Sequence, residues 1–242
     1  MIFSKNGPIR SFKRKIRERW RWRGNPEEVF TRIYNRNIWG SKESVSGTGS
    51  ELQATTKIRE EIPALVKEYE VKRLLDVPCG DYNWMKYVVP KLDVEYIGGD
   101  IVRPIIQENN RRWGSDGVSF IHIDLTCDHL PRADLMLVRD CLFHLSHEAI
   151  YRFLENFCRS DIKYLLTTTF VSPYLNDKAG INSDCMVGSD RPLYLHNHPF
   201  CFPEPLNIIV EDELFKNLLL FDYDQILVAR NNMKQNLQSM VT

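Results

Sequence analysis

The feature of this chain that most constrains its fold is a short apolar run that stops at a tight turn flanked by acids. Residues Lys72 to Trp84 read KRLLDVPCGDYNW, and the apolar run breaks at Pro78 and Gly80. A second apolar run, VEYIGGD, follows about a helix length later and ends at Asp100. This order is typical of a βαβ unit with a small-residue first turn and a carboxylate at the tip of its second strand. Such a unit binds the ribose of a nucleoside-containing cofactor.

Apolar runs and helical patterns alternate on both sides of this unit. Strands are predicted near residues 72–77, 94–100, 118–123, 134–139 and 162–168. Helices are predicted near residues 26–37, 51–69, 83–90, 103–112 and 146–159. Two late apolar runs, Leu206–Val210 and Leu218–Val228, are predicted to form a terminal antiparallel pair. The expected fold class is α/β: a Rossmann-like, doubly wound, mostly parallel sheet with a terminal antiparallel strand pair and an N-terminal helical extension.

The length of 242 residues fits one large domain with an extension at each end. We expect a basic amphipathic arm over residues 1–24, a single domain over residues 25–230 and a frayed tail over residues 231–242. Residues 170–205 contain five prolines and show no clear period. A loop of this length inside a domain is usually functional, so we interpret it as a substrate lid.

Composition excludes several classes of protein. No stretch approaches the ~18 consecutive apolar residues of a transmembrane helix, and the N-terminus lacks an apolar leader, so we expect a cytoplasmic protein. His196 and His198 lack a third ligand at clear spacing, and no metal is expected. The cysteines form no CxxC pair, which argues for reduced thiols and against a zinc ribbon or a disulfide framework. They are Cys79, Cys127, Cys141, Cys158, Cys185 and Cys201.

The net charge of zero hides an asymmetry between the N-terminus and the rest of the chain. Residues 1–24 hold nine Lys and Arg against the single acid Glu18, so this segment carries +8 and the remainder −8. Residues 9–23 read as a basic amphipathic helix, and Asn25 is a suitable N-cap for the helix that follows. The open alternatives are phosphate contacts with nucleic acid, an anionic membrane surface, the acidic body of the protein, or a solvated arm. We favour a solvated arm or a weak association with an anionic surface, possible also at a membrane periphery, and expect no nucleic acid.

The first turn of the βαβ unit argues for a cofactor without phosphates. A dinucleotide fingerprint requires GxGxxG, whereas the turn Pro78-Cys79-Gly80 has one glycine. S-adenosylmethionine has no phosphate and carries a cationic sulfonium and amine, which suit nearby acids such as Asp76 and Asp81. The turn therefore favours S-adenosylmethionine over a nicotinamide. A nicotinamide-dependent oxidoreductase and a non-catalytic cofactor-binding domain are the alternatives.

Four motifs in order carry a resemblance to a known family. LLDVPCGDYNWM resembles motif I of the class I S-adenosylmethionine-dependent methyltransferases, in a variant with Pro-Cys-Gly-Asp in place of Gly-Cys-Gly-Thr. YIGGDIV, FIHIDLT and DLMLVRDCLFHL resemble the next three motifs, and together they cover about Lys72–Ser146. WGSKESVSGTGS and PFCFPEPL resemble segments of a group of bacterial, often uncharacterised methyltransferases. The resemblance implies a methyltransferase-like domain over residues 25–230 that methylates oxygen of a small molecule or a glycan.

The resemblance also implies where the cofactor binds. The implied cofactor-binding residues are Asp76, Gly80, Asp81, Asp100, Ile101, Asp124, Leu125 and Arg139. Asp76 would lie along the methionine part, and Asp100 would accept both ribose hydroxyls, since a carboxylate takes two O–H donors side by side. Asp124 would sit at the adenine edge, a role that Asp128 could also take. Arg139 ends the fourth strand, where the sulfonium should point.

Candidate catalytic and substrate residues follow the fourth strand and occupy the loops. A hydroxyl nucleophile gains from a nearby base, and Asp140 and His144 are the candidates, with His147 in the first turn of the next helix. In the long loop, Asp184 and His196 are candidate substrate contacts. The glycine-rich segment WGSKESVSGTGS is predicted to close over the cofactor or merely to connect two helices, with Trp39 and Ser46 as its candidate contacts.

Overall fold

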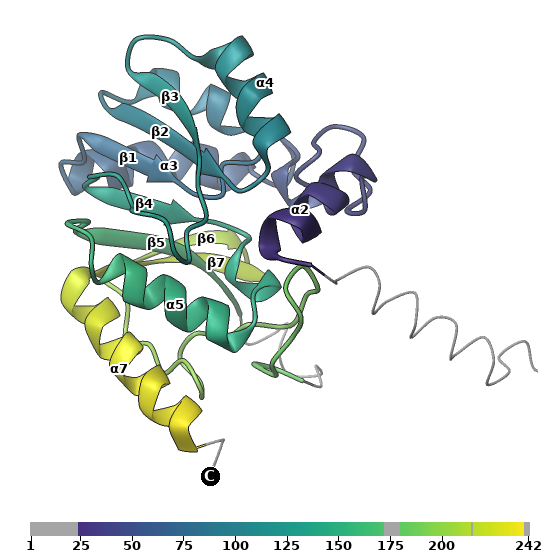
Figure 1. Cartoon of the computed structure of the whole chain (residues 1–242). Coiled ribbons are helices and arrows are strands. Elements are labelled where there is room, and N and C mark those ends of the chain that lie inside the picture. The colour runs from purple at the N-terminus through teal and green to yellow at the C-terminus, as the bar shows by residue number, and fades with distance from the viewer. Residues whose placement is uncertain (1–23, 172–179, 214, 240–242) are drawn as a thin grey trace, which may run out of the picture.

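The computed structural model describes residues 24–171, 180–213 and 215–239, so most of the predicted basic arm lies outside the described residues. Within these residues, seven strands form one sheet in the order β3-β2-β1-β4-β5-β7-β6 (Figure 1). The first five strands of this order are parallel, whereas β7 runs antiparallel to both β5 and β6. This arrangement confirms the predicted fold class. The strands are β1 (Arg73–Asp76), β2 (Glu95–Asp100), β3 (Val118–His122), β4 (Leu135–Val138), β5 (Tyr164–Phe170), β6 (Asn207–Asp212) and β7 (Lys216–Asp222).

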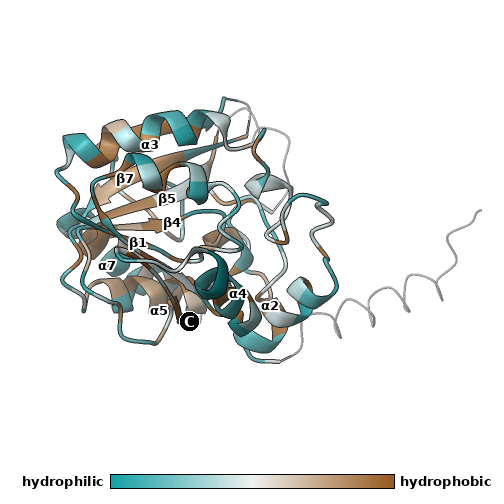
Figure 2. Ribbon diagram, turned by 90° about the horizontal axis from the view of Figure 1, so that it is seen from above, coloured by the Kyte–Doolittle hydropathy of each residue, from teal (hydrophilic) through white to brown (hydrophobic). Residues whose placement is uncertain are grey.

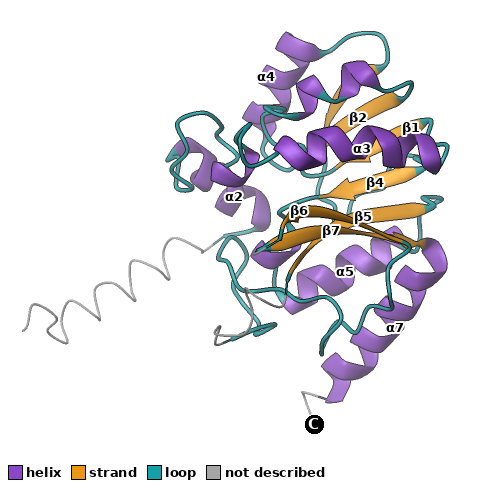
Figure 3. Cartoon of the chain, turned by 180° about the vertical axis from the view of Figure 1, so that it is seen from behind, coloured by secondary structure: helices purple, strands orange, loops and turns teal. Residues whose placement is uncertain are grey.

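Helices cover both faces of the sheet. The α-helices are α2 (Pro26–Asn35), α3 (Thr56–Glu68), α4 (Arg103–Trp113), α5 (His147–Phe157) and α7 (Tyr223–Ser239). In the described part of the chain, four short 3-10 turns join them, namely η1 (Thr48–Ser50), η2 (Met85–Tyr87), η3 (Val89–Lys91) and η4 (Leu142–His144). Helix α3 lies on one face of the sheet, and α5 and α7 lie on the other (Figures 1 and 3). Among the described residues, no helix has both the length and the apolar character needed to cross a bilayer.

Strand β1, in the interior of the sheet, is buried on both faces, which explains its continuous apolar sequence. Successive strand residues point to opposite faces of a sheet. Accordingly, Leu74 packs with Ile58 of α3, whereas Leu75 packs in the other layer with Phe153 of α5. Hydropathy colouring shows brown, apolar strands lying between helices that combine polar and apolar residues (Figure 2). The strands therefore hold their carboxyl ends in fixed positions.

The predicted N-cap Asn25 is present, and a serine caps a second helix in the same way. The Asn25 side chain accepts a hydrogen bond from the Glu28 N–H at 2.9 Å, and Pro26 occupies the first turn of α2. The Ser146 hydroxyl accepts from the Ala149 N–H at 3.2 Å and begins α5. Capping at Ser146 separates α5 from η4, so the residues just before it stay at the edge of the sheet.

Residues 83–90 do not form the predicted helix but the two turns η2 and η3. Pro90 lies at the start of η3 and has no N–H to donate, and its ring would clash with the carbonyl four residues earlier in an α-helix. Tyr82, just before this segment, takes a positive φ of 57°. The connection after β1 is therefore compact, and its apolar side chains Met85 and Val88 pack beneath the sheet.

The C-terminal residues form a helix, which corrects two predictions. Strand β7 ends at Asp222 rather than Val228, and residues predicted to fray continue α7 to Ser239. Asp222 and Gln225 cap the helix reciprocally: the Gln225 N–H donates to Asp222 Oδ1 at 2.8 Å, and the Asp222 N–H donates to Gln225 Oε1 at 3.0 Å. This capping box is a helix-start signal that the apolar run concealed. Met233 is fully buried in the layer that also holds α5, which anchors the helix.

Gly99 of β2 is a position where the sheet leaves no room for a side chain. A Cβ there would lie 2.5 Å from Ile123 Cγ2 and 2.7 Å from Val77 Cγ2, both in a buried layer. We expect Gly99→Ala to lower the free energy of unfolding by about 1–3 kcal/mol because the neighbours must shift. Urea denaturation measures the change. Ser119→Ala, at an exposed position of the adjacent strand β3, is the control and should stay within about 0.5 kcal/mol; an equally small effect of Gly99→Ala would contradict the argument.

Candidate active site

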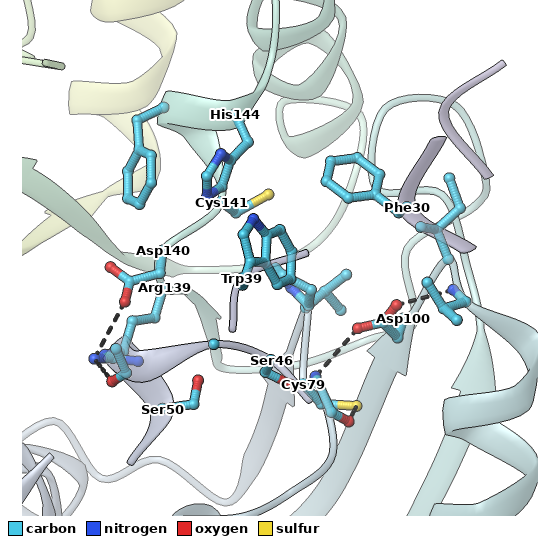
Figure 4. A pocket seen from close by; sticks show the side chains of 18 of the residues that line it. Phe30, Trp39, Ser46, Ser50, Cys79, Asp100, Arg139, Asp140, Cys141 and His144 are labelled. Carbon is cyan, nitrogen blue, oxygen red and sulfur yellow. Dashed lines mark hydrogen bonds and ion pairs between the residues drawn. The ribbon is translucent and has the colours of Figure 1, made fainter. Parts of the chain in front are cut away.

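A cavity of about 630 Å³ opens at the carboxyl ends of the parallel strands. Its walls include residues at or after the ends of β1, β2, β3 and β4 (Figure 4). Strand β1 has β2 on one side and β4 on the other, so the chain reverses its direction of winding here. Open α/β sheets bind ligands at this kind of switch point. The volume is in the range of pockets that hold a small organic ligand.

The cavity collects most of the residues that the sequence singled out. Nine of the residues predicted for cofactor binding or catalysis and both loop candidates line it: Asp76, Gly80, Asp100, Ile101, Asp124, Leu125, Arg139, Asp140, His144, Trp39 and Ser46. Asp81, Asp184 and His196 do not line it, and neither does any other described residue of 180–205. The described residues of the long loop therefore do not cover the cavity.

Asp100 is held rigidly at the end of β2. Its Oδ2 accepts a hydrogen bond from the Gly80 N–H at 3.1 Å, and its Oδ1 accepts from the Val102 N–H at 2.9 Å (Figure 4). Burial raises the pKa of Asp100 to about 6, although these two N–H groups oppose the shift. A carboxylate fixed in this way presents its remaining lone pairs to the cavity in one orientation.

Asp76 is a buried acid at the end of β1. Its Oδ2 accepts the Tyr96 hydroxyl at 2.6 Å. Burial raises the pKa of Asp76 to about 7, even though the Tyr96 hydrogen bond and the charge of Arg139 lower it. A cationic ligand in the cavity would stabilise the charged form of this carboxyl.

Glycine is required at the turn between these acids. Gly80 has φ +54°, and a Cβ there would lie 2.1 Å from Ser46 Oγ. The Gly80 carbonyl accepts from Asn109 Nδ2 at 2.8 Å, which fixes the turn against α4. The backbone of the turn and the segment around Ser46 consequently touch with no room for a side chain.

Asp81 anchors a loop instead of facing the cavity. Its carboxylate accepts hydrogen bonds from Ser44 Oγ at 2.8 Å, from the Val45 N–H at 3.0 Å and from Ser46 Oγ at 3.1 Å. Its own N–H donates to Ser46 Oγ at 3.0 Å. The glycine-rich segment 39–50 is thus tied across the turn and forms a wall of the cavity through Trp39 and residues 45–50. The sequence predicted that Asp81 would bind the cofactor because it follows the turn. The Asp81 side chain instead points to the loop, because the loop supplies three hydrogen-bond donors to its carboxylate.

A cluster of four charges lies on another side of the cavity. Arg139 donates to the Gly49 carbonyl at 2.6 Å and pairs with Glu211 of β6, and its guanidinium carbon lies 5.4 Å from the centre of the Trp84 ring. Lys216 of β7 contacts Asp140 at 2.5 Å and Glu211 at 3.0 Å. Sequence reasoning missed Glu211 and Lys216, because they lie in the terminal strands far along the chain from Arg139.

Asp140 is an ion-paired carboxylate and therefore a poor candidate for the general base. It follows β4 in the left-handed region with φ 51°, and its N–H donates to Thr168 Oγ1 at 2.9 Å. Burial opposes ionisation, but the charges of Arg139 and Lys216 lower the pKa of Asp140 to about 2. A group with so low a pKa accepts a proton weakly near neutral pH. Its role here is to balance the two cations.

His144 has the geometry expected of a general base. Its Nδ1 lies 3.0 Å from the Ser189 carbonyl, which can only accept, so Nδ1 carries the hydrogen and Nε2 is left to take up a proton. Burial lowers the pKa of His144, which keeps the ring neutral. The ring centre lies 5.4 Å from that of Trp39 (Figure 4). The Gly188 N–H donates to the His144 carbonyl at 2.8 Å, so the long loop fixes both backbone and ring.

The remaining predicted polar residues have local structural partners. Asp184 Oδ1 accepts from the His147 N–H at 2.7 Å and so caps α5, while His147 Nε2 lies 2.9 Å from the Asn182 carbonyl. His196 Nδ1 lies 3.2 Å from the Phe202 carbonyl. Asp124 accepts from the Thr126 N–H and hydroxyl at 2.8 and 2.7 Å, yet it still lines the cavity. Its alternative, Asp128, accepts from the Asp124 N–H at 2.9 Å and does not line the cavity.

Known structures share this fold. No family model and no curated protein sequence matches the chain. The structure resembles human N-acetylserotonin methyltransferase in complex with S-adenosylmethionine, with a TM-score of 0.57 and 14% identity over 81% of this chain and 59% of that one. It resembles the mitomycin 7-O-methyltransferase MmcR with a TM-score of 0.55 and 13% identity over 81% of this chain and 57% of that one. The chain thus spans less than two thirds of these two proteins.

A third similar structure matches nearly end to end. The 1,6-didemethyltoxoflavin-N1-methyltransferase of Burkholderia thailandensis, with S-adenosylhomocysteine bound, gives a TM-score of 0.53 and 14% identity over 91% of this chain and 92% of that one. At identities this low, the structural similarity establishes the fold alone. The chain has the fold of the class I S-adenosylmethionine-dependent methyltransferases, as the four sequence motifs predicted.

The raised pKa of Asp76 makes stability depend on pH. The folded protein keeps this proton up to about pH 7, whereas the unfolded chain releases it near the ordinary value of 3.8. The contribution to stability is therefore present at low pH and is lost as the pH rises from about 4 to 7. Between roughly pH 5 and 7.5, wild type should lose on the order of 2 kcal/mol more unfolding free energy than Asp76→Asn.

Urea denaturation across this pH range measures the difference. Asp76→Asn keeps an acceptor for the Tyr96 hydroxyl but does not titrate, and Asp100 titrates in both proteins. Parallel stability profiles for the two proteins would show that Asp76 is not a buried, protonated acid.

Proposed function

We propose that the protein is an S-adenosylmethionine-dependent methyltransferase that methylates a hydroxyl oxygen of a small molecule or a glycan. The observation that carries the proposal is the fixed carboxylate of Asp100 beside the Gly80 turn, in the same cavity as a neutral His144. The similar structures support it, since they are methyltransferases and two of them contain bound S-adenosylmethionine or S-adenosylhomocysteine.

The residues of the cavity fit this cofactor. Asp100 would accept the ribose hydroxyls, and Ile101 and Leu125 would hold the adenine between apolar side chains, with Asp124 at its edge. The buried carboxyl of Asp76 would face the cationic methionine part. The single glycine of the turn gives the backbone close access but no cradle for a pyrophosphate, which disfavours a nicotinamide.

The chain's own chemistry is positioning and proton removal. S-adenosylmethionine supplies a methyl group on sulfur, which is already a good leaving group. Methyl transfer then requires in-line placement of the acceptor oxygen and removal of its proton. His144 lines the cavity, and with its Nδ1 hydrogen directed at the Ser189 carbonyl its Nε2 would accept that proton.

Calorimetric titration separates the candidate functions. S-adenosylmethionine and S-adenosylhomocysteine should bind with micromolar affinity, and NAD should show no binding. Binding of NAD without binding of either sulfur compound would overturn the proposal in favour of an oxidoreductase. Binding without turnover on any acceptor in a labelled-methyl screen would indicate a non-catalytic domain.

Asp100→Ala tests the ribose contact. We expect S-adenosylhomocysteine affinity to fall by about 1–3 kcal/mol, because the ribose hydroxyls and the Gly80 and Val102 N–H groups lose their acceptor. Asp116→Ala, at an exposed acid before β3, is the matched control and should bind normally. Unchanged affinity of a folded Asp100→Ala protein would remove Asp100 from the site.

His144→Ala tests the base. We expect cofactor affinity to be retained and kcat to fall by about 10²–10⁴. In the wild-type protein, kcat should decline as the pH drops below the lowered pKa of His144. In the variant, kcat should no longer depend on pH in this range. His129→Ala, at an exposed position outside the cavity, is the control. A wild-type rate in His144→Ala would make His144 structural.

Two further proposals concern the basic N-terminal segment and the cellular location of the protein. The basic segment 9–23 lies outside the described residues, and its charge supports a weak association with an anionic surface. A cytoplasmic location is supported by the unpaired state of all six cysteines.

A further inference from the structure

Aromatic rings surround the proposed base. The Phe30 and Trp39 ring centres lie 6.4 Å apart, and Trp39 lies 5.4 Å from His144. The Phe143 ring centre lies 4.3 Å from that of His144 and 5.3 Å from that of Phe170. All five residues line the cavity, and we refer to Phe30, Trp39, Phe143 and Phe170 as the aromatic wall. Figure 4 shows Phe30, Trp39 and His144 on the same side of the cavity.

The aromatic wall is assembled from separate parts of the chain. Phe30 belongs to α2, Trp39 to the loop tied down by Asp81, Phe143 to η4, and Phe170 to the end of β5. Rings that meet from four segments form a continuous apolar surface around His144. Such a surface binds a flat ring by offset or edge contacts between ring centres 4.5–7 Å apart.

The four charged side chains of the cluster beside this surface have partners within the protein. Asp140 and Lys216 pair with each other, and Glu211 pairs with Arg139 and Lys216. A sugar carries a hydroxyl on most of its carbons, and each hydroxyl that leaves water needs a hydrogen-bond partner. The aromatic wall offers one donor, the indole N–H of Trp39, beside the imidazole of His144, which is too few for the several hydroxyls of a sugar. A glycan acceptor would therefore be poorly satisfied here.

The weak basicity of His144 also disfavours a glycan, because it favours an acceptor with an acidic hydroxyl. Burial keeps His144 neutral with a lowered pKa, so it is a weak base. A phenolic hydroxyl has a pKa of about 10, as in tyrosine, whereas an alcohol is close to water at about 15.7. Proton transfer to a weak imidazole is far less uphill from the phenol.

We propose that the acceptor is a planar aromatic compound with a hydroxyl on the ring, bound against the aromatic wall with that hydroxyl at His144 Nε2. This inference rests on the proposed function and narrows its substrate class. The phenolic oxygen bonds to the methyl carbon while the carbon–sulfur bond breaks and its electron pair stays on sulfur. The phenolic proton passes to His144 Nε2. The products are an aryl methyl ether and S-adenosylhomocysteine.

Matched probes test the inference. Naphthol, its saturated counterpart decalol, and methyl glucoside are titrated by calorimetry against the full-length protein saturated with S-adenosylhomocysteine. Naphthol should bind about tenfold tighter than decalol, because ring–ring contacts add to the area buried. Methyl glucoside should bind more weakly than both.

Variants of the aromatic wall connect this preference to particular rings. Trp39→Leu and Phe143→Leu should each remove most of the advantage of naphthol over decalol and leave S-adenosylhomocysteine affinity within about threefold of wild type. Trp113→Leu is the matched control, since Trp113 is an exposed tryptophan of α4 outside the cavity. It should keep the full preference. Using two wall variants keeps the test decisive if one of them fails to fold.

The outcomes separate this inference from the proposed function. Equal affinities for naphthol and decalol, tighter binding of methyl glucoside, or no naphthol binding would overturn the aromatic acceptor and leave the methyltransferase proposal intact. A preference unchanged in both wall variants would overturn the assigned surface. Failure of S-adenosylhomocysteine itself to bind would overturn the proposed function.

Discussion

The carboxyl edge of the sheet is organised by an imbalance of buried charge. Asp140 and Glu211 are matched by the cations of Arg139 and Lys216. Asp76 and Asp100, on the neighbouring strands, have only neutral hydrogen-bond donors in direct contact, and burial raises the pKa of both. Because a buried acid without a cation is costly, this side of the cavity is suited to a positively charged ligand. The proposed cofactor meets that requirement.

The shape of the cavity depends on how one loop is tied to the turn after β1. Asp81 satisfies three donors of segment 44–46, and Gly80 lets the same segment approach the backbone. Trp39 and Gly49 are carried by this loop, and Gly49 in turn accepts a hydrogen bond from Arg139. The Asp81 carboxylate, which lies outside the cavity, therefore positions both the cavity wall beside the Gly80 turn and Trp39 of the aromatic wall.

Sequence reasoning succeeded where structure is local. Asp76 and Asp100 end apolar strands, and parallel strands bring such ends to one edge whatever the rest of the chain does. It failed where the partner is distant: Glu211 reaches Arg139, and Lys216 reaches Asp140, only because β7 inserts between β5 and β6. It also failed for Asp81, because nearness to a turn does not say which way a side chain points. The start of α7 was marked by a local capping box that an apolar run outweighed.

The long loop, interpreted from sequence as a lid, has a different relation to the site. Its described residues stay out of the cavity but bond to the backbone of η4 and of the residue after it. The N–H groups of Gly188 and Arg191 donate to the carbonyls of His144 and Phe143, and the Arg191 guanidinium donates to the Leu145 carbonyl. The Ser189 carbonyl meanwhile selects the tautomer of His144. A base gains most from a support that fixes its proton and orientation before the acceptor arrives. The two irregular segments thus divide the work: residues 39–50 enclose the cavity, and residues 180–205 orient the group that would act in it.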